Sequence, residues 1–190
     1  MFFVDLNLYK WYSYLMRGKV PLFNVFIKRY IVMIKGKLLT PNSPEVKKCF
    51  EIRHKVFIEE QNVPKEEEYD NWDNFAKFVA VYDNDEIVGT GRIFFDGDEY
   101  RIGRIAVLKE HRGKHYGDFI VRILIDNAFD NGAEEIHLGA QVRAVGFYEK
   151  IGFKVCGEEY IDANIPHLPM ILKRQDFCTG CGHTVNYDEK

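Results

Sequence analysis

The sequence has few cysteines and few prolines. Among its 190 residues there are four Cys and six Pro. The cysteines are at positions 49, 156, 178 and 181, so only the last two are close together. Small secreted domains have a much denser cysteine framework, because disulfides compensate for the core that they are too short to build. We therefore expect a reducing, cytoplasmic location.

Long apolar runs are also lacking. Residues 1–30 are rich in aromatic side chains, but basic residues and a proline divide them: Lys10, Arg17, Lys19, Pro21, Lys28 and Arg29. A membrane helix needs ~18 uninterrupted apolar residues, and a signal peptide needs a small-residue cleavage site after its apolar core. We expect neither. Residues 1–30 are predicted to be an extension that lies on a membrane surface or on the protein, a frayed tail, or residues upstream of a start at Met33.

Most of the chain lacks an excess of positive charge. Residues 1–40 carry seven Lys/Arg against one acid, Asp5, whereas the other 150 residues carry 19 Lys/Arg against 28 Asp/Glu, a net charge of −9. This acidic body argues against nucleic acid as the main partner and is compatible with a cationic amine substrate. The length and the 46% hydrophobic content suit one domain with extensions.

The apolar periodicity predicts an α/β domain. We expect strands at 31–39, 78–82, 86–95, 100–108, 135–142, 153–161 and 168–173, and helices at 44–58, 113–131 and 144–150. Ser43 is placed to cap the first helix, and the acidic residues 59–73 are expected to form a surface loop. The strand-helix-strand order over 100–142 predicts that its two strands are parallel neighbours in a mixed sheet.

The turn between the strand at 100–108 and the next helix is suited to binding a pyrophosphate. It contains Arg112, Gly113, Lys114, His115, Tyr116 and Gly117. A glycine-containing turn that leads directly into a helix presents free backbone N–H groups at the positive end of the helix dipole. Arg112 and Lys114 add positive charge there. Taken alone, the same pattern also fits an ordinary charged turn between a strand and a helix.

This turn resembles the phosphate loop of the GNAT superfamily, written as Arg or Gln, two residues, Gly, one residue, then Gly or Ala. His115 departs from the pattern at its fourth position, where Gly permits close approach of a phosphate, although His adopts positive φ more often than most residues. The segment with Gly139, Gln141, Tyr148 and Phe153 resembles the second half of the superfamily signature, in which a Tyr faces the thioester sulfur. Tyr148 is therefore a candidate general acid. The alternative is that it is a core aromatic residue.

A third stretch resembles the ElaA-like branch of this superfamily. It includes Arg53, Glu60–Gln61, Val63–Pro64 and the acidic residues 66–70, with Ile165–Pro166–His167 and Met170 near the far end. The resemblance covers about residues 35–174 and implies a domain over 31–174. It also implies a mostly antiparallel mixed sheet with helices on both faces and a splayed pair of parallel strands.

The resemblance further implies that acetyl-CoA lies between the splayed strands. Its pantetheine would pair with the backbone of Ile105, Ala106 and Val107, and its pyrophosphate would lie on the loop from Arg112 to Gly117. The implied reaction is N-acetylation of a primary amine by direct attack, with a backbone N–H near Val107 stabilising the oxyanion. A non-catalytic acyl-CoA-binding sensor is the alternative.

Attack by an amine requires its neutral form, so a base must be near. Glu60 and His167 are the candidates, although Glu60 could simply be solvated and His167 could be a loop histidine with satisfied hydrogen bonds. The acidic run 66–73 could attract a cationic acceptor through its field, or it could be a solvated loop. Neither the acceptor nor the oligomeric state follows from the sequence.

The tail, residues 175–190, contains Cys178, Cys181 and His183. A structural zinc site needs four ligands, and the sequence has no second CxxC. We therefore expect no metal. A redox dithiol would need a thioredoxin-like strand-turn-helix context, which the flanking sequence does not suggest.

Overall fold

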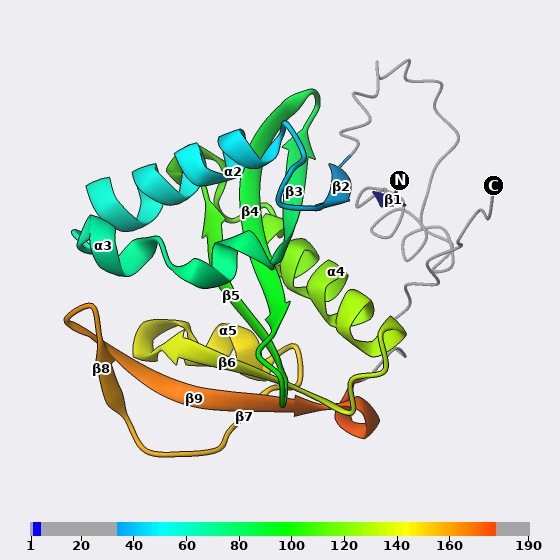
Figure 1. The fold of residues 1–190 in the computed structure, drawn as a ribbon, viewed down its shortest axis with the longest axis vertical. Helices are drawn as coiled ribbons and strands as arrows, with labels where there is room; N and C mark the ends of the chain where they lie inside the picture. The colour runs from blue at the N-terminus through cyan, green and yellow to red at the C-terminus, as the bar shows by residue number, and fades with distance from the viewer. Residues whose placement is uncertain (1, 5–33, 178–190) are drawn as a thin grey trace, which may run out of the picture.

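The computed structural model describes residues 2–4 and 34–177 (Figure 1). Most of the predicted N-terminal extension and the cysteine-containing tail, with Cys178, Cys181 and His183, lie outside the described residues. In the part that is described, no helix is both long enough and apolar enough to cross a membrane.

Within the described ranges, nine strands form one mixed sheet. The strands are β1 (Phe2–Val4), β2 (Ile34–Leu39), β3 (Lys77–Asp83), β4 (Glu86–Phe95), β5 (Tyr100–Val107), β6 (Glu135–Gln141), β7 (Lys154–Val155), β8 (Tyr160–Asp162) and β9 (Ile165–Lys173). Their order is β1-β2-β3-β4-β5-β6-β9-β7, and β8 also pairs with β9. Only β5 and β6 are parallel. This confirms the predicted mixed sheet and its parallel pair. The single strand expected at 153–161 was wrong, because β7 and β8 are separate strands.

The helices are α2 (Val46–Arg53), the π-helix η1 (His54–Glu59), α3 (Lys65–Glu68), α4 (Tyr116–Asp130) and α5 (Val145–Glu149). Short 3₁₀ turns lie at η2 (Asn71–Asn74), η3 (Lys109–His111), η4 (Val142–Ala144) and η5 (Arg174–Asp176). The Ser43 cap was wrong: its Oγ accepts the N–H of Thr40 at 3.1 Å, and α2 has no side-chain cap. The surface loop expected at 59–73 was also wrong, since it contains α3 and η2 and buries Glu68 and Asp73.

Helices cover both faces of the sheet. Along β3, Val79 and Val81 join the core cluster that contains α4, whereas Phe78 and Ala80 join the cluster that contains α2. Alternate residues of a strand face opposite sides of a sheet, so α4 and α2 pack on opposite faces. Figure 1 shows β6 and β9 turning across the end of the block formed by β2–β5.

The parallel strands diverge soon after they meet. β5 and β6 pair only at Tyr100–Ile136 and Arg101–His137. A bulge lies opposite β4, because the register passes from Arg92–Gly103 to Thr90–Ala106, three residues of β5 against two of β4. A bulge bends the strand that carries it, and Arg104 inside it has a φ of +53°. The strands therefore enclose a V-shaped opening beyond Arg101.

Candidate active site

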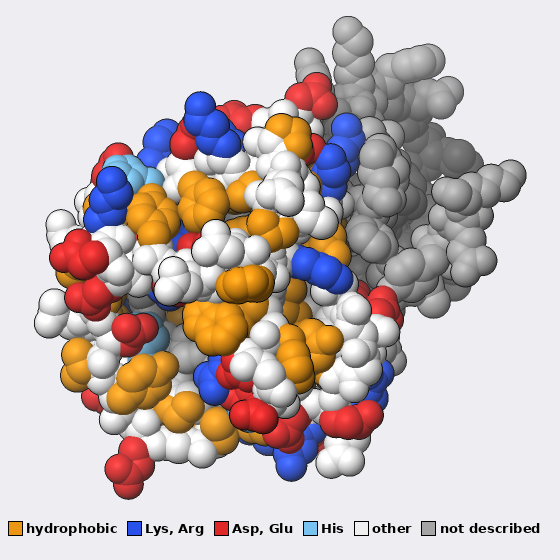
Figure 2. Space-filling view, in the orientation of Figure 1, with side chains coloured by type: hydrophobic (Ala, Val, Ile, Leu, Met, Phe, Trp, Pro, Cys, Tyr) orange, Lys and Arg blue, Asp and Glu red, His pale blue; other side chains and the backbone are white. Residues whose placement is uncertain are grey.

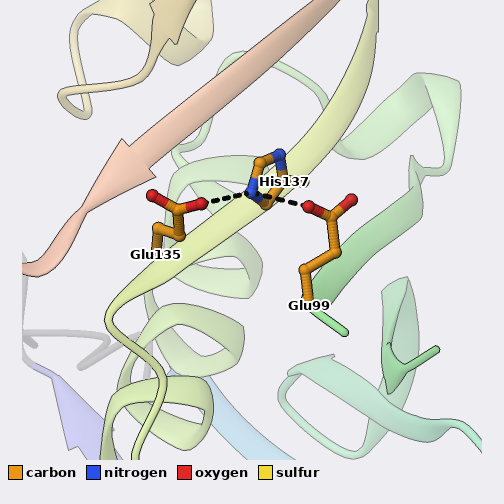
Figure 3. Close-up of side chains that lie close together, drawn as sticks. All are labelled: Glu99, Glu135 and His137. Atoms are coloured by element: carbon orange, nitrogen blue, oxygen red, sulfur yellow. Dashed lines mark hydrogen bonds and ion pairs between the residues drawn. The ribbon is translucent and has the colours of Figure 1, made fainter. Parts of the chain in front are cut away.

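A cluster of charged side chains holds the closed end of the V (Figure 3). His137 Nε2 lies 2.9 Å from Glu99 Oε2 and 3.2 Å from Glu135 Oε1. Arg101 also pairs with Glu99. The cluster joins Glu99, the residue before β5, to the start of β6. The two strands are therefore held together at this end and separate at the other.

A pocket of about 320 Å³ lies in the open part of the V. We call it the loop pocket, and it is lined by Val56, Glu60, Gln61, Ile105, Val107, Arg112 and Arg143. Arg112 donates from Nε to the Val107 carbonyl at 2.9 Å and from Nη2 to Glu60 Oε2 at 2.8 Å. Glu60 is therefore an ion-pair partner of the predicted phosphate loop. Ala106 is almost fully buried, and it pairs with Thr90 of β4.

The predicted phosphate loop has the backbone that an anion site needs. Gly113 and His115 have φ values of +78° and +64°, and α4 begins at the next residue, Tyr116, without a side-chain cap. The first N–H groups of an uncapped helix are free donors at its positive end. His115 adopts the left-handed conformation that glycine would adopt in the superfamily pattern, with its side chain exposed.

Other loop side chains are directed elsewhere. The Tyr116 ring is buried, and its hydroxyl bonds to Asp83, so Tyr116 has only its backbone N–H for an anion. Lys114 is exposed and lies 3.4 Å from Asp83. At Gly117, an added Cβ would contact the Phe147 ring at 3.7 Å.

A second cavity, of about 620 Å³, adjoins the loop pocket. We call it the aromatic cleft, and its ring-bearing lining residues are Phe57, Trp72, Phe94, Tyr148, Tyr160 and His167. Gln61 and Ile105 line both cavities. Gln141 Nε2 donates to Gln61 Oε1 at 2.8 Å, which links β6 to the segment after η1 at this junction.

Tyr148 is held rigidly on α5. Its ring makes edge contacts with Phe147 and Phe153, at centroid distances of 4.9 and 5.9 Å. Burial raises the pKa of the Tyr148 phenol above its ordinary value. The hydroxyl therefore stays protonated at neutral pH and can act as a donor.

His167 lines the same cleft from β9. It is 9% exposed, and its Nδ1 lies 2.8 Å from the Ile165 carbonyl. A carbonyl only accepts, so Nδ1 carries the proton and Nε2 of the neutral ring is an acceptor. Tyr160 stacks on the ring at 5.7 Å. A Cβ at Gly139 would collide with the Tyr160 hydroxyl, so this stack requires glycine on β6.

The candidate residues thus fall into two groups. Tyr148 and His167 line the aromatic cleft, whereas Glu60 and Arg112 line the loop pocket. The two candidate bases are therefore in different cavities, and only His167 shares one with Tyr148.

A buried ion-pair network forms one wall of the aromatic cleft, and sequence reasoning missed it. The Arg53 side chain is 1% exposed and contacts Glu68 at 2.5 Å and Asp73 at 2.7 Å. Arg92 pairs with Asp70 and Asp73 at 2.5 and 2.6 Å. Burial acts to raise the pKa of Asp70, but the hydrogen bond and charge of Arg92 outweigh it, and the pKa is lowered. One feature of the sequence could have indicated that Arg53 is buried. It lies four residues after Cys49 and three before Val56, in a series of apolar residues at helical spacing.

Comparison with known proteins places the chain in a family. Residues 42–174 match the model of an acetyltransferase (GNAT) domain, and the chain belongs to this family. It is similar to the uncharacterized N-acetyltransferase YjcF of Bacillus subtilis, with 42% identity over 135 residues, which are 70% of this chain and 96% of YjcF.

Two solved structures show the same fold. Escherichia coli ElaA has a TM-score of 0.67 and 27% identity, covering 74% of this chain and all of that one. A GNAT family acetyltransferase from Elizabethkingia anophelis, solved with acetyl-CoA bound, has a TM-score of 0.56 and 14% identity, covering 74% of this chain and 97% of that one. At that identity the likeness concerns the fold alone.

Proposed function

We propose that this protein is an N-acetyltransferase that uses acetyl-CoA to acetylate a primary amine by direct attack. The observation that carries the proposal is the junction of two cavities at the open end of the β5–β6 pair. The first cavity is lined by Arg112, whose loop leads into the uncapped start of α4, and the second is lined by the buried Tyr148 and by His167, which offers an acceptor nitrogen.

The residues around the loop pocket fit acetyl-CoA. The free N–H groups at the start of α4 and the side chains of Arg112 and Lys114 would bind the pyrophosphate. The backbone of Ile105 and Val107 would pair with the pantetheine, because β6 has left this edge of β5, whereas Ala106 between them faces Thr90 of β4. The match to the acetyltransferase (GNAT) domain family supports acetyl-CoA as the donor.

The aromatic cleft supplies the proton chemistry. When bound, acetyl-CoA provides the thioester that the amine attacks. Nε2 of His167 would take the proton of the incoming ammonium, and the Tyr148 hydroxyl would give a proton to the departing thiolate. The Leu108 N–H bonds to Val88 of β4, and neighbouring N–H groups of a strand point to opposite edges. The Val107 N–H would therefore face the opening, where it can stabilise the oxyanion.

Glu60 is the second candidate base. Its ion pair with Arg112 gives it another role, since it would orient the arginine of the phosphate loop. Glu60→Gln should then weaken acetyl-CoA binding and leave turnover at saturation unchanged. If Glu60 is the base, its loss would lower turnover instead, and His167→Asn would not.

The proposal is tested by calorimetry with acetyl-CoA and by thiol release with a panel of primary amines, polyamines and short peptides. Binding together with amine-dependent release of CoA is expected. Binding without release from any amine would favour the sensor alternative. Absence of binding would overturn the proposal and show that the loop with His115 does not hold the cofactor.

A further inference from the structure

The aromatic cleft has more carboxylates than guanidiniums. Its charged lining residues are five acids, Glu67, Glu68, Asp70, Asp96 and Asp162, and three arginines, Arg92, Arg101 and Arg104. Each arginine is paired: Arg92 with Asp70 at 2.5 Å, Arg104 with Glu68 at 2.9 Å and Arg101 with Asp96 at 2.6 Å. Within residues 2–4 and 34–177, Glu67 and Asp162 form no ion pair. The charge left over in the cleft is negative.

The two unpaired carboxylates come from opposite sides of the cleft. Glu67 lies on α3 and Asp162 on β8, and both are exposed. Figure 1 shows α3 and β8 facing each other across the left side of the molecule. In Figure 2, acidic and hydrophobic side chains gather on that side. The acids are therefore at the rim, where a ligand enters.

The cleft also offers aromatic surfaces. Trp72 and Phe94 stack at 4.8 Å, and Trp72 remains 40% exposed. Aromatic faces attract organic cations and cover aliphatic chains. Deeper in the cleft, His167 is nine-tenths buried, and its Nε2 has no hydrogen-bond partner among the described residues. Nε2 keeps access to the cleft, so it is free to accept a hydrogen bond from a ligand there.

Building on the proposed acetyl transfer, we infer that the acceptor is a small aliphatic diamine or polyamine. One amino group would lie at His167 and Tyr148, lose its proton to His167 and attack the acetyl carbon. A second, protonated nitrogen would lie between Glu67 and Asp162. An amino acid fits poorly, because none of the three arginines that line the cleft is left unpaired for its carboxylate.

The inference is tested with three acceptors of matched chain length: 1,4-diaminobutane, 1-aminobutane and 4-aminobutanoate. The full-length protein is saturated with acetyl-CoA, and thiol release is followed. Because exposed ion pairs contribute modestly, kcat/KM for the diamine should exceed that for the monoamine by about tenfold. The amino acid should be the poorest acceptor.

Variants identify the residues that hold the second nitrogen. The Glu67→Gln, Asp162→Asn double variant should raise KM for the diamine about tenfold, with kcat and the monoamine rates unchanged. Glu66→Gln is the matched control, because Glu66 is an exposed acid of α3 that does not line the cleft. It should leave all rates unchanged.

The outcomes separate this inference from the function on which it rests. Three results would overturn the diamine as acceptor and leave acetyl transfer standing. They are equal use of diamine and monoamine, preference for a lysyl peptide, or an unchanged KM for the diamine in the double variant. If none of the amines increases thiol release, both the diamine and acetyl transfer are overturned. A diamine preference that disappears in the double variant and persists in Glu66→Gln supports the inference.

Discussion

The two cavities at the open V have opposite charge and obtain it in different ways. The loop pocket has two guanidiniums, Arg112 and Arg143, against one carboxylate, Glu60, whereas the aromatic cleft has five carboxylates against three guanidiniums. The Arg112–Glu60 pair is exposed to solvent, but Arg92 and Asp73 of the cleft wall are buried. The contrast suits a polyanionic cofactor in the loop pocket and a cationic acceptor in the aromatic cleft. The hydrogen-bonded pair Gln61–Gln141 lies where the two cavities meet.

The cavities also differ in how the chain builds them. Most of the loop pocket comes from η1 and from a continuous segment, β5 with the turn into α4. The cleft walls come from η1 to η2, from β4 and β5, and from β6 to β9. Variants at residues that line only one cavity should therefore leave the other cavity working, and the predictions that follow test this independence.

Tyr148→Phe should have the largest effect. It removes the hydroxyl and keeps the ring between Phe147 and Phe153. Loss of a general acid should lower kcat by a factor of about 10² to 10⁴, with little change in the Kd for acetyl-CoA. Tyr160→Phe, in the same cleft, is the control and should retain most of the turnover. Near-normal kcat for Tyr148→Phe would show that Tyr148 is only a core residue.

Arg53→Met should break the cleft wall. It leaves Glu68 and Asp73 each without one of their buried cations, so the free energy of unfolding should fall by roughly 3–5 kcal/mol in urea titrations. Lys55→Met, two residues along at an exposed position, should change it by less than ~0.5 kcal/mol. In the protein that still folds at low temperature, amine KM should rise more than the Kd for acetyl-CoA. A rise in Kd alone would contradict the independence of the two cavities.

Arg112→Gln tests the other cavity. It removes one positive charge from the phosphate loop and frees Glu60, so the Kd for acetyl-CoA should rise about tenfold, measured by calorimetry. Amine KM at saturating acetyl-CoA should not change. Arg122→Gln, at a half-exposed position of α4 where the arginine pairs with Asp118, controls for the loss of a positive charge. An equal effect from both variants would indicate a general field instead of a binding contact.

His115→Gly should have the smallest effect. Glycine adopts the left-handed backbone of this position without strain but loses more entropy on folding, so the free energy of unfolding should change by less than about 1 kcal/mol. His115→Val should destabilise by about 1–2 kcal/mol, because a β-branched residue resists a φ of +64°. Equal thermal stability of the two variants would mean that the loop relaxes to another conformation.

Local sequence patterns predicted the helices and strands, whereas the walls of the aromatic cleft depend on contacts between residues that are distant in sequence. The strands at β3, β4 and β6 and the helix α4 follow from apolar periodicity, and the parallel pair follows from the order of elements. The acidic segment 59–73 looked solvated because its partners, Arg53 and Arg92, are distant in sequence. The same holds for the Gln61–Gln141 hydrogen bond, whose partners are 80 residues apart.

In the candidate site, too, the residues of one continuous segment could be predicted and the pairing of distant residues could not. The predicted phosphate loop is contiguous, so its residues could be named from one segment. The pairing of Glu60 with Arg112 could not be predicted, because it depends on the π-helix η1, whose wider turn changes the direction in which the following residues point.

Because the V opens where β5 and β6 stop pairing, its existence depends on backbone topology and on the Glu99–His137–Glu135 cluster at its closed end, and not on the side chains of the cleft walls. Mutations that accumulate in η1–η2 or β8–β9 can therefore change the shape and charge of the cleft walls while the opening and the phosphate loop are inherited intact. Descendants of one ancestral chain could in this way acquire new acceptors by drift in two peripheral segments, without a period in which the thioester donor is lost.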